Sequence, residues 1–107
     1  MNGMFYGCSS LKELNIINFK THNVTNMTSI FSECSLLKQL NLNNFNTNNV
    51  FDMRGIFSEC SSLKELNLNN FNTNNVKFMS GMFSGCSDEF KIKFEIQYKN
   101  KNLNNYI

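Results

Sequence analysis

Residues 31–50 read FSECSLLKQLNLNNFNTNNV, and residues 57–76 read FSECSSLKELNLNNFNTNNV. The two stretches start 26 residues apart and differ at only two positions, 36/62 and 39/65. Self-similarity at a fixed period of about 20–50 residues is typical of repeat architectures, in which one supersecondary unit stacks on its neighbours. This stretch therefore decides the fold, because the chain spells one structural unit more than once.

The 26-residue step extends beyond these two copies. It is kept by phenylalanines, cysteines and strand leucines: Phe5, Phe31, Phe57, Phe83, Cys8, Cys34, Cys60, Cys86, Leu14, Leu40 and Leu66. We therefore read residues 1–107 as a single domain. It has a partial repeat at 1–7, repeats at about 8–33, 34–59 and 60–85, and a C-terminal segment at 86–107.

Each unit contains a short apolar alternation. Leu14 and Ile16 alternate with polar Glu13 and Asn15, which is the period of a strand with one buried side. The frame Leu11-x-x-Leu14-x-Ile16 also fits the leucine-rich repeat, whose length is about 20–29 residues. We expect the strands of successive units to pair side by side in a parallel sheet.

A helical spacing follows the strand. Val24, Met27, Ile30 and Phe31 lie at i, i+3, i+6 and i+7, which places them on one face of a two-turn helix. The residue directly before this run is an asparagine in every unit, and asparagine is a good N-cap: Asn23, Asn49 and Asn75. The sequence thus predicts one short helix per unit.

Phenylalanine stands where the leucine-rich frame usually carries Asn or Cys. We expect these residues to form a buried spine: Phe19, Phe45 and Phe71. Threonines are the candidate partners for the loop backbone that this change leaves without a side-chain amide: Thr21, Thr47 and Thr73. The predicted fold is an α/β leucine-rich-repeat solenoid of about 3.5 coils, with a parallel sheet on one face and short helices on the other.

The two ends of the chain depart from the repeat. Residues 90–98 alternate apolar and polar side chains, with Ile92 and Phe94 in the register of the first strand. We predict a fourth, longer strand that caps the stack, with Lys91 and Lys93 on its outer side. The chain starts inside a unit, so we expect the N-terminal edge to be uncapped and either to associate or to continue in a longer array.

Composition excludes several classes of function. The net charge of +2 and the lack of a basic stripe interleaved with aromatics argue against nucleic acid as a partner. No run approaches about 18 apolar residues, so we expect no membrane insertion. The N-terminal MNGMFYGCSS lacks a basic region followed by an apolar run, so no signal peptide is expected in this chain.

Few residues could carry chemistry. If strands stack about 4.8 Å apart, Cys8 and Cys86 lie roughly 14 Å apart, so the four cysteines cannot surround one zinc ion. Disulfides between adjacent coils stay open, although parallel Cβ vectors favour a ladder of buried thiols. His22 is the only histidine, and its counterparts are Asn48 and Asn74. We expect no metal, no cofactor and no catalytic activity.

The outward side of the strands is the candidate partner-binding face, because repeat solenoids bind through an extended concave surface. Its predicted members come from all four strands: Glu13, Asn15, Ile17, Gln39, Asn41, Asn43, Glu65, Asn67, Asn69, Lys91 and Lys93. Asn15, Asn41 and Asn67 would form an amide ladder. This ladder either contributes to a specific site or only satisfies itself and keeps the sheet in water.

The repeat F-x-x-C-S-S-L-K-E-L-N-L-N-N-F-N-T-N-N-V-x-x-M resembles the BspA-type leucine-rich repeat, M-F-x-x-C-x-S-L-x-x-L-D-L-S-x-F-D-T-S-N-V-T-N-M. The resemblance covers residues 4 to about 87, and the stretch from Asn23 to Met27 matches V-T-N-M closely. Asn replaces the Asp and Ser of that family at several places.

The resemblance implies a solenoid of a secreted or cell-surface protein that adheres to a protein of a host or a neighbouring cell. Because no signal peptide is expected in this chain, a cytoplasmic location stays open. Two alternatives to adhesion also stay open. One is a structural spacer repeat without a ligand, and the other is an intracellular scaffold repeat that recruits substrates.

Overall fold

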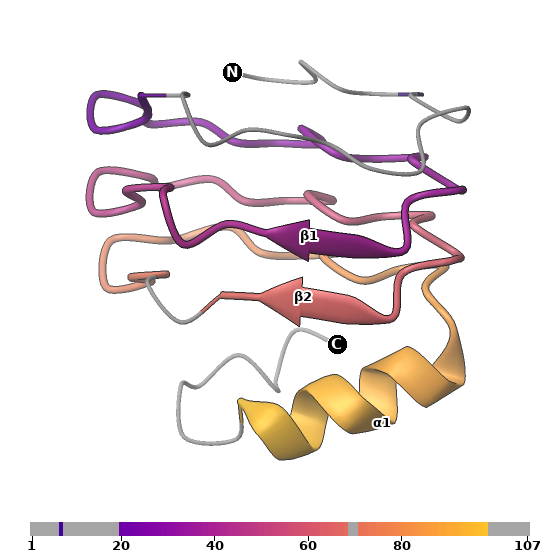
Figure 1. Ribbon diagram of the computed structural model, residues 1–107. Helices are drawn as coiled ribbons and strands as arrows, with labels where there is room; N and C mark the ends of the chain where they lie inside the picture. Colours follow the sequence, from indigo (N-terminus) through magenta and orange to yellow (C-terminus); the bar gives the residue numbers. More distant parts are fainter. Residues whose placement is uncertain (1–6, 8–19, 69–70, 99–107) are drawn as a thin grey trace.

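Two parallel strands and one helix are the regular elements of the computed structural model, which describes residue 7, residues 20–68 and residues 71–98. The strands are β1 (Gln39–Asn41) and β2 (Glu65–Asn67), and the helix is α1 (Asp88–Gln97). Figure 1 shows the chain following the same path in successive layers, with β1 above β2 and α1 below them. The protein is thus an α/β structure with a small parallel sheet.

The sheet confirms the predicted strand alternation. β1 and β2 pair in parallel with Leu40 opposite Leu66, which is a register of one repeat. Both leucines are buried at 4% exposure, whereas the residues at either side of Leu40 are exposed. The backbone N–H of Leu42 donates to Asn67 at 3.1 Å, so the pairing continues just beyond the strands.

The predicted helices are wrong, because the segments opposite the sheet are runs of turns. The N–H of Met27 donates to the carbonyl of Asp52 at 2.9 Å, and the N–H of Phe31 donates to Ile56 at 3.0 Å. Other N–H groups close short turns, as from Ile30 to Met27 at 3.4 Å. These segments thus bond to the next layer instead of within a helix.

The backbone conformation explains why no helix forms there. Ser29 has φ 57° and Glu33 has φ 62°, and the equivalent Gly55 has φ 62°. A positive φ lies in the left-handed region, which an α-helix of L-residues cannot contain. The apolar spacing that suggested a helix therefore points the same side chains inward from consecutive turns.

Phenylalanine rings stack through the core, but not in the predicted column. Phe31 and Phe57 have centroids 5.9 Å apart at an interplanar angle of 1°, and Phe57 and Phe83 lie 5.5 Å apart at 13°. The predicted spine residues Phe45 and Phe71 are buried, as expected, at 2% and 5% exposure. Phe19 lies outside the described residues. The parallel ring stack thus comes from the segment predicted to be helical.

The threonine prediction is confirmed for two units. The Thr21 hydroxyl donates to the Asn46 carbonyl at 3.2 Å and accepts from the Asn46 N–H at 2.7 Å. The Thr47 hydroxyl makes the same pair with Asn72, at 3.1 and 2.7 Å. Each hydroxyl therefore satisfies both backbone groups of a residue in the next layer.

The asparagines predicted as N-caps have another role. The Asn49 side-chain amide donates to the His22 carbonyl at 2.9 Å, and the Asn75 amide donates to the Asn48 carbonyl at 2.6 Å. With no helix to cap, these amides link one layer to the layer before it.

The predicted fourth strand is also wrong, because its residues form α1. Ser87 caps the helix, accepting from the Phe90 N–H at 3.1 Å, and Asp88 begins an acidic first turn. A Ser N-cap and early carboxylates both favour a helix. Phe90 and Phe94 are buried, whereas Ile92, expected inside, is 60% exposed. A helix buries every fourth residue here, and the strand would have buried every second.

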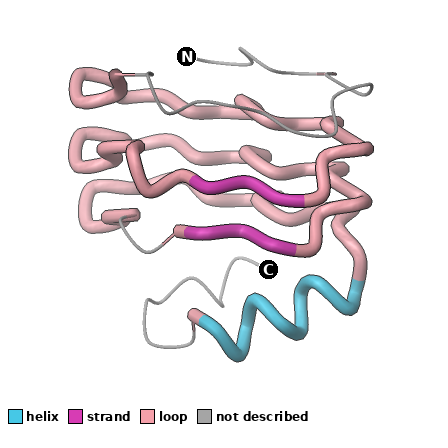
Figure 2. The backbone as a smooth tube through the Cα atoms, viewed as in Figure 1, coloured by secondary structure: helices cyan, strands magenta, loops and turns pink. Residues whose placement is uncertain are grey.

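α1 covers the open edge of β2 (Figure 2). The Tyr98 hydroxyl, directly after α1, accepts from the Leu68 N–H at 2.8 Å and donates to the Leu66 carbonyl at 3.1 Å. On the other side of β2, β1 supplies such bonds. One phenol thus replaces the backbone groups that a further strand would bring.

Candidate binding surfaces

Part of the predicted binding face lies on the exposed side of the sheet. Gln39, Asn41 and Glu65 are exposed and Asn67 is half-buried. The register places Gln39 beside Glu65 and Asn41 beside Asn67. Asn43 is half-buried after β1 and donates its N–H to Asn41 Oδ1 at 2.9 Å. Four predicted members lie outside the described residues: Glu13, Asn15, Ile17 and Asn69.

The two predicted lysines reach different places from those expected, because they lie on α1 and not on a strand. Lys93 Nζ lies 2.6 Å from Glu65 Oε1, so the helix brings this lysine to the strand face after all. Lys91 is half-buried elsewhere on the helix. Since both partners of the Lys93–Glu65 pair are more than half exposed, the pair contributes little to stability.

A second surface, which sequence reasoning missed, lies on the turn segments. We call Phe51, Arg54, Lys77 and Phe78 the aromatic–arginine patch. Phe51 and Phe78 are 39% and 46% exposed, and their rings meet edge-on with centroids 6.4 Å apart. The Arg54 guanidinium carbon lies 5.0 Å from the Phe78 centroid, within cation–π range. Lys77 is exposed beside them in the sequence.

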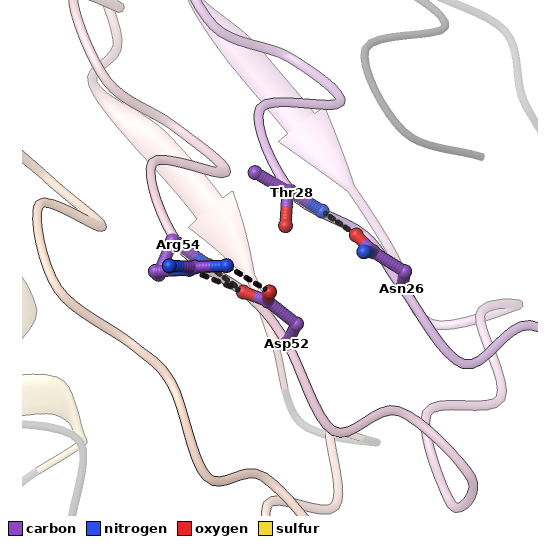
Figure 3. Close-up of polar contacts among 4 residues, drawn as sticks. All are labelled: Asn26, Thr28, Asp52 and Arg54. Carbon is purple, nitrogen blue, oxygen red and sulfur yellow. Dashed lines mark hydrogen bonds and ion pairs between the residues drawn. The ribbon is translucent and has the colours of Figure 1, made fainter.

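A buried carboxylate holds Arg54 in place (Figure 3). Asp52 Oδ2 lies 2.6 Å from Arg54 Nη2, and Asp52 Oδ1 accepts from Arg54 Nε at 3.0 Å. The Asp52 side chain is 3% exposed, whereas the Arg54 side chain is 51% exposed. The hydrogen bonds from the guanidinium hold the pKa of Asp52 below its ordinary value, against the opposing effect of burial. The carboxylate is thus a buried anchor, and the guanidinium is a fixed surface cation.

The same turn occurs in the preceding unit without the ion pair. There Asn26 Oδ1 accepts from the Thr28 N–H at 2.8 Å, as Asp52 Oδ1 accepts from the Arg54 N–H at 3.1 Å (Figure 3). Both are Asx turns closed by the equivalent hydrogen bond. The second unit therefore changes the side chains of this surface while it keeps the backbone path.

The sequence signal for the patch is a break in the repeat. Methionine is kept at Met27, Met53 and Met79, because these residues are buried. The positions around it differ in every unit: 25/51/77 read Thr, Phe and Lys, and 26/52/78 read Asn, Asp and Phe. Except for the buried Asp52, the varying residues are exposed or half-buried, so they are candidates for recognition. These positions were not recognised from the sequence because a helix was expected there.

The described cysteines are buried and free: Cys34, Cys60 and Cys86. The Cys60 thiol donates to the Phe31 carbonyl at 3.1 Å, and the Cys86 thiol donates to Phe57 at 3.3 Å. Burial raises the pKa of Cys60 to about 12 and that of Cys86 to about 11. The thiol ladder is confirmed for these three, and Cys60 and Cys86 are poor nucleophiles because the thiolate is disfavoured. Cys8 lies outside the described residues.

Neither a cluster of metal-binding side chains nor a membrane-spanning helix is present in the described ranges 20–68 and 71–98 with residue 7. Within them, no group of three or more His, Cys, Asp or Glu residues is placed to hold a metal ion. In the same ranges, no helix has the length and apolar character needed to cross a membrane.

The molecule is an α/β protein whose 26-residue sequence repeat carries a constant interior and variable outer side chains. Comparison with protein-family models matches residues 1–106 to the family described as "Mycoplasma protein of unknown function, DUF285". The chain belongs to this family. No match was found among curated proteins or among solved structures.

Proposed function

We propose that this chain is a non-catalytic protein-binding module with the architecture of a BspA-type leucine-rich-repeat solenoid. The one-repeat register of β1 and β2 and the bonds between successive turn segments support a solenoid. The sequence resemblance described above supports the BspA type. In this proposal, the exposed side of the sheet is the adhesive surface.

The observation that carries the proposal is the row of exposed side chains on the sheet. Gln39 and Glu65 stand side by side on an exposed face, and position 39/65 is one of the two that differ between the near-identical copies. Behind them, Leu40 and Leu66 are the same residue in both units and are buried. A surface that varies over a fixed core is what a binding scaffold requires.

The partner we propose is a protein on a host cell or a neighbouring cell, and the location is the cell surface. The polar groups of the face suit hydrogen bonding to a protein surface, in which about one hydrogen bond forms per 100–200 Å² of interface. We propose no catalytic role, since the described cysteines are buried thiols and the sole histidine, His22, is an exposed loop residue.

Binding of the fluorescently labelled chain to animal epithelial cells, measured by flow cytometry, tests this function. We expect saturable binding that is lost when the cells are first treated with trypsin, because the ligand is a protein. The triple variant Gln39→Ala/Glu65→Ala/Asn67→Ala should bind at least about tenfold more weakly, as central contacts dominate interface energies. Asn41 is left unchanged because its side chain accepts the Asn43 N–H.

Thr25→Ala is the matched control, since Thr25 is exposed on a turn segment away from the sheet. This variant should bind like the wild type. Equal binding by the triple variant and the wild type would refute the strand face as the site. Absence of any binding by the wild type would favour the spacer alternative.

A further inference from the structure

Two exposed apolar surfaces of this chain carry complementary charge. The first is the outer face of α1, where Ile92 and Ile96 are 60% and 73% exposed. Phe90 and Phe94 are buried on the inner side of the helix, so residues about two positions away point outward. The exposed isoleucines therefore form an outward apolar ridge on α1.

Acidic side chains surround this ridge. Glu89 lies three residues before Ile92 on the same outward side, and Asp88 and Glu95 are exposed at its border. Of the two lysines of α1, Lys93 is paired with Glu65 and reaches toward β2, and Lys91 is half-buried. The outer face of α1 is thus apolar at its centre and negative at its border.

The second surface is the aromatic–arginine patch, which has the opposite charge. Its two exposed rings supply the apolar area, and Arg54 and Lys77 supply positive charge. The one carboxylate within the same turn, Asp52, is buried and already bonded to Arg54, so it does not face outward. The patch is therefore aromatic at its centre with exposed cations.

We propose that the outer face of α1 in one copy of this chain docks on the aromatic–arginine patch of a second copy. Ile92 and Ile96 would cover Phe51 and Phe78, and the carboxylates around the ridge would face Arg54 and Lys77. Buried apolar area supplies affinity, and the charges supply orientation and register. The proposal is independent of ligand binding by the strand face.

The contact is heterologous, because two different surfaces meet. Each copy in a pair keeps one free patch or one free helix face, so further copies add to form a ring or an open chain. The contact is small, which predicts weak association with a dissociation constant on the order of 0.1 mM. Assembly should therefore depend steeply on concentration.

Sedimentation velocity of the full chain, from about 10 µM to about 1 mM around the expected dissociation constant, tests the proposal. The wild type should shift to larger species across this range. The patch variant Phe51→Thr/Phe78→Asn should stay monomeric at every concentration. The chain itself suggests these changes, because Thr25 occupies the position of Phe51 one unit earlier and Asn26 occupies the position of Phe78 two units earlier. The helix variant Ile92→Gln/Ile96→Gln should also stay monomeric.

The mixture of the two variants gives the decisive result. One variant keeps an intact helix face and the other keeps an intact patch, so an equimolar mixture should form a one-to-one dimer and nothing larger. A monomeric wild type at about 1 mM would overturn the proposal. So would self-association of the helix variant alone, which would indicate a patch-to-patch contact, or a mixture that stays monomeric.

Charge variants provide a second measurement on exposed residues that carry no core packing. Lys77→Glu alone and Glu89→Lys/Glu95→Lys alone should each weaken association at least about threefold. Mixing the two should restore it, because each variant then meets its opposite charge. Undiminished association in both charge variants would contradict the pairing proposed here.

Discussion

At the scale of single residues, asparagine side chains replace backbone partners throughout the described chain. Asn46 Oδ1 accepts from the Asn48 N–H at 3.0 Å, and Asn72 Oδ1 accepts from the Asn74 N–H at 2.9 Å. An Asx turn of this kind bends the chain without a helix or a strand. The described asparagines that make such turns are therefore structural, and the abundance of asparagine alone indicates no binding site.

Thr47→Val tests the bridge between layers. The substitution keeps the shape of the side chain but removes the hydroxyl that bonds both the N–H and the carbonyl of Asn72. Unsatisfied polar groups in a buried place cost about 1–3 kcal/mol, so the free energy of unfolding should fall by that amount in urea titrations. Thr73→Val is the control, because Thr73 is half-exposed and should lose much less. Equal losses would contradict the bridge.

The thiol ladder predicts a loss of stability in alkali. Unfolded cysteines ionise near their ordinary value of 9.0, whereas burial raises the pKa of Cys60 to about 12 and of Cys86 to about 11. The folded state keeps these protons, so stability is fully present below pH 9 and falls as pH rises toward the folded values.

The matched variant is Cys60→Ala/Cys86→Ala. It should be less stable than the wild type at neutral pH, because it leaves cavities, but its stability should fall less steeply above pH 9. Urea midpoints measured across that range give both slopes. Other alkaline titrations are common to the two proteins, so parallel slopes would argue against raised thiol pKa values.

At the scale of elements, α1 shows how one apolar spacing fits two structures. Phe90, Phe94 and Tyr98 are four residues apart, which is a multiple of the strand period and close to the helix period. All three residues would be buried in a strand as well as in a helix. The Ser87 N-cap favours the helix, and the exposure of Ile92 and Ile96 distinguishes the helix from the strand.

Tyr98→Phe tests how α1 closes the sheet. The change keeps the buried ring and removes the hydroxyl that bonds the Leu68 N–H and the Leu66 carbonyl. We expect a loss of about 1–3 kcal/mol in unfolding free energy and faster hydrogen exchange at the Leu68 amide. Ile96→Ala, an exposed change on the same helix, should alter neither. Unchanged protection of Leu68 would contradict the edge bond.

At the scale of the whole molecule, each layer is stabilised by its neighbours. The Phe57 ring lies between the rings of Phe31 and Phe83, and the turn segments bond to one another layer by layer. Stability in such a stack is a sum of unit and neighbour terms. Damage at one interface should therefore weaken the layers on both sides.

Phe57→Leu tests this coupling. Since Phe→Ala changes in cores cost about 3–5 kcal/mol, the smaller change to Leu should cost about 1–2 kcal/mol. Native-state hydrogen exchange should accelerate at the amides of both Phe31 and Phe57, which bond to successive layers. Phe51→Leu is the matched control at an exposed ring. Acceleration on one side alone would argue for independent layers.

The inside and outside of the described units were predictable from the sequence. The recurring Leu40 and Leu66, and Phe45 and Phe71, are buried as expected. The polar positions of the strands are exposed or half-buried, and Gln39 and Glu65 face water. In these units, apolar side chains that recur at a fixed step are buried whichever conformation the backbone adopts, so their burial follows from composition and period alone. Of the two candidate surfaces, the strand face could be predicted from the same alternation of apolar and polar residues.

The aromatic–arginine patch and the backbone of the turn segments were not predictable in this way. Met27, Ile30 and Phe31 recur at a spacing that suits a helix and also suits inward residues of successive turns. The positive φ of Ser29 and Glu33 rules out the helix. Serine and glutamate do not indicate a positive φ in the sequence, whereas a glycine such as Gly55 does. With a helix assumed, Phe51 and Phe78 could not be placed together on one surface.

By itself, the sequence determined the repeating unit, its 26-residue period and which side chains are buried. Only the tertiary structure decided where the backbone hydrogen bonds go. Met27 bonds to Asp52 and Phe31 bonds to Ile56, each one residue short of a full 26-residue repeat away. The physical reason is that a buried N–H must find an acceptor, and a neighbouring layer supplies one as well as a helix does. That choice depends on the stacked neighbour, which no local spacing contains.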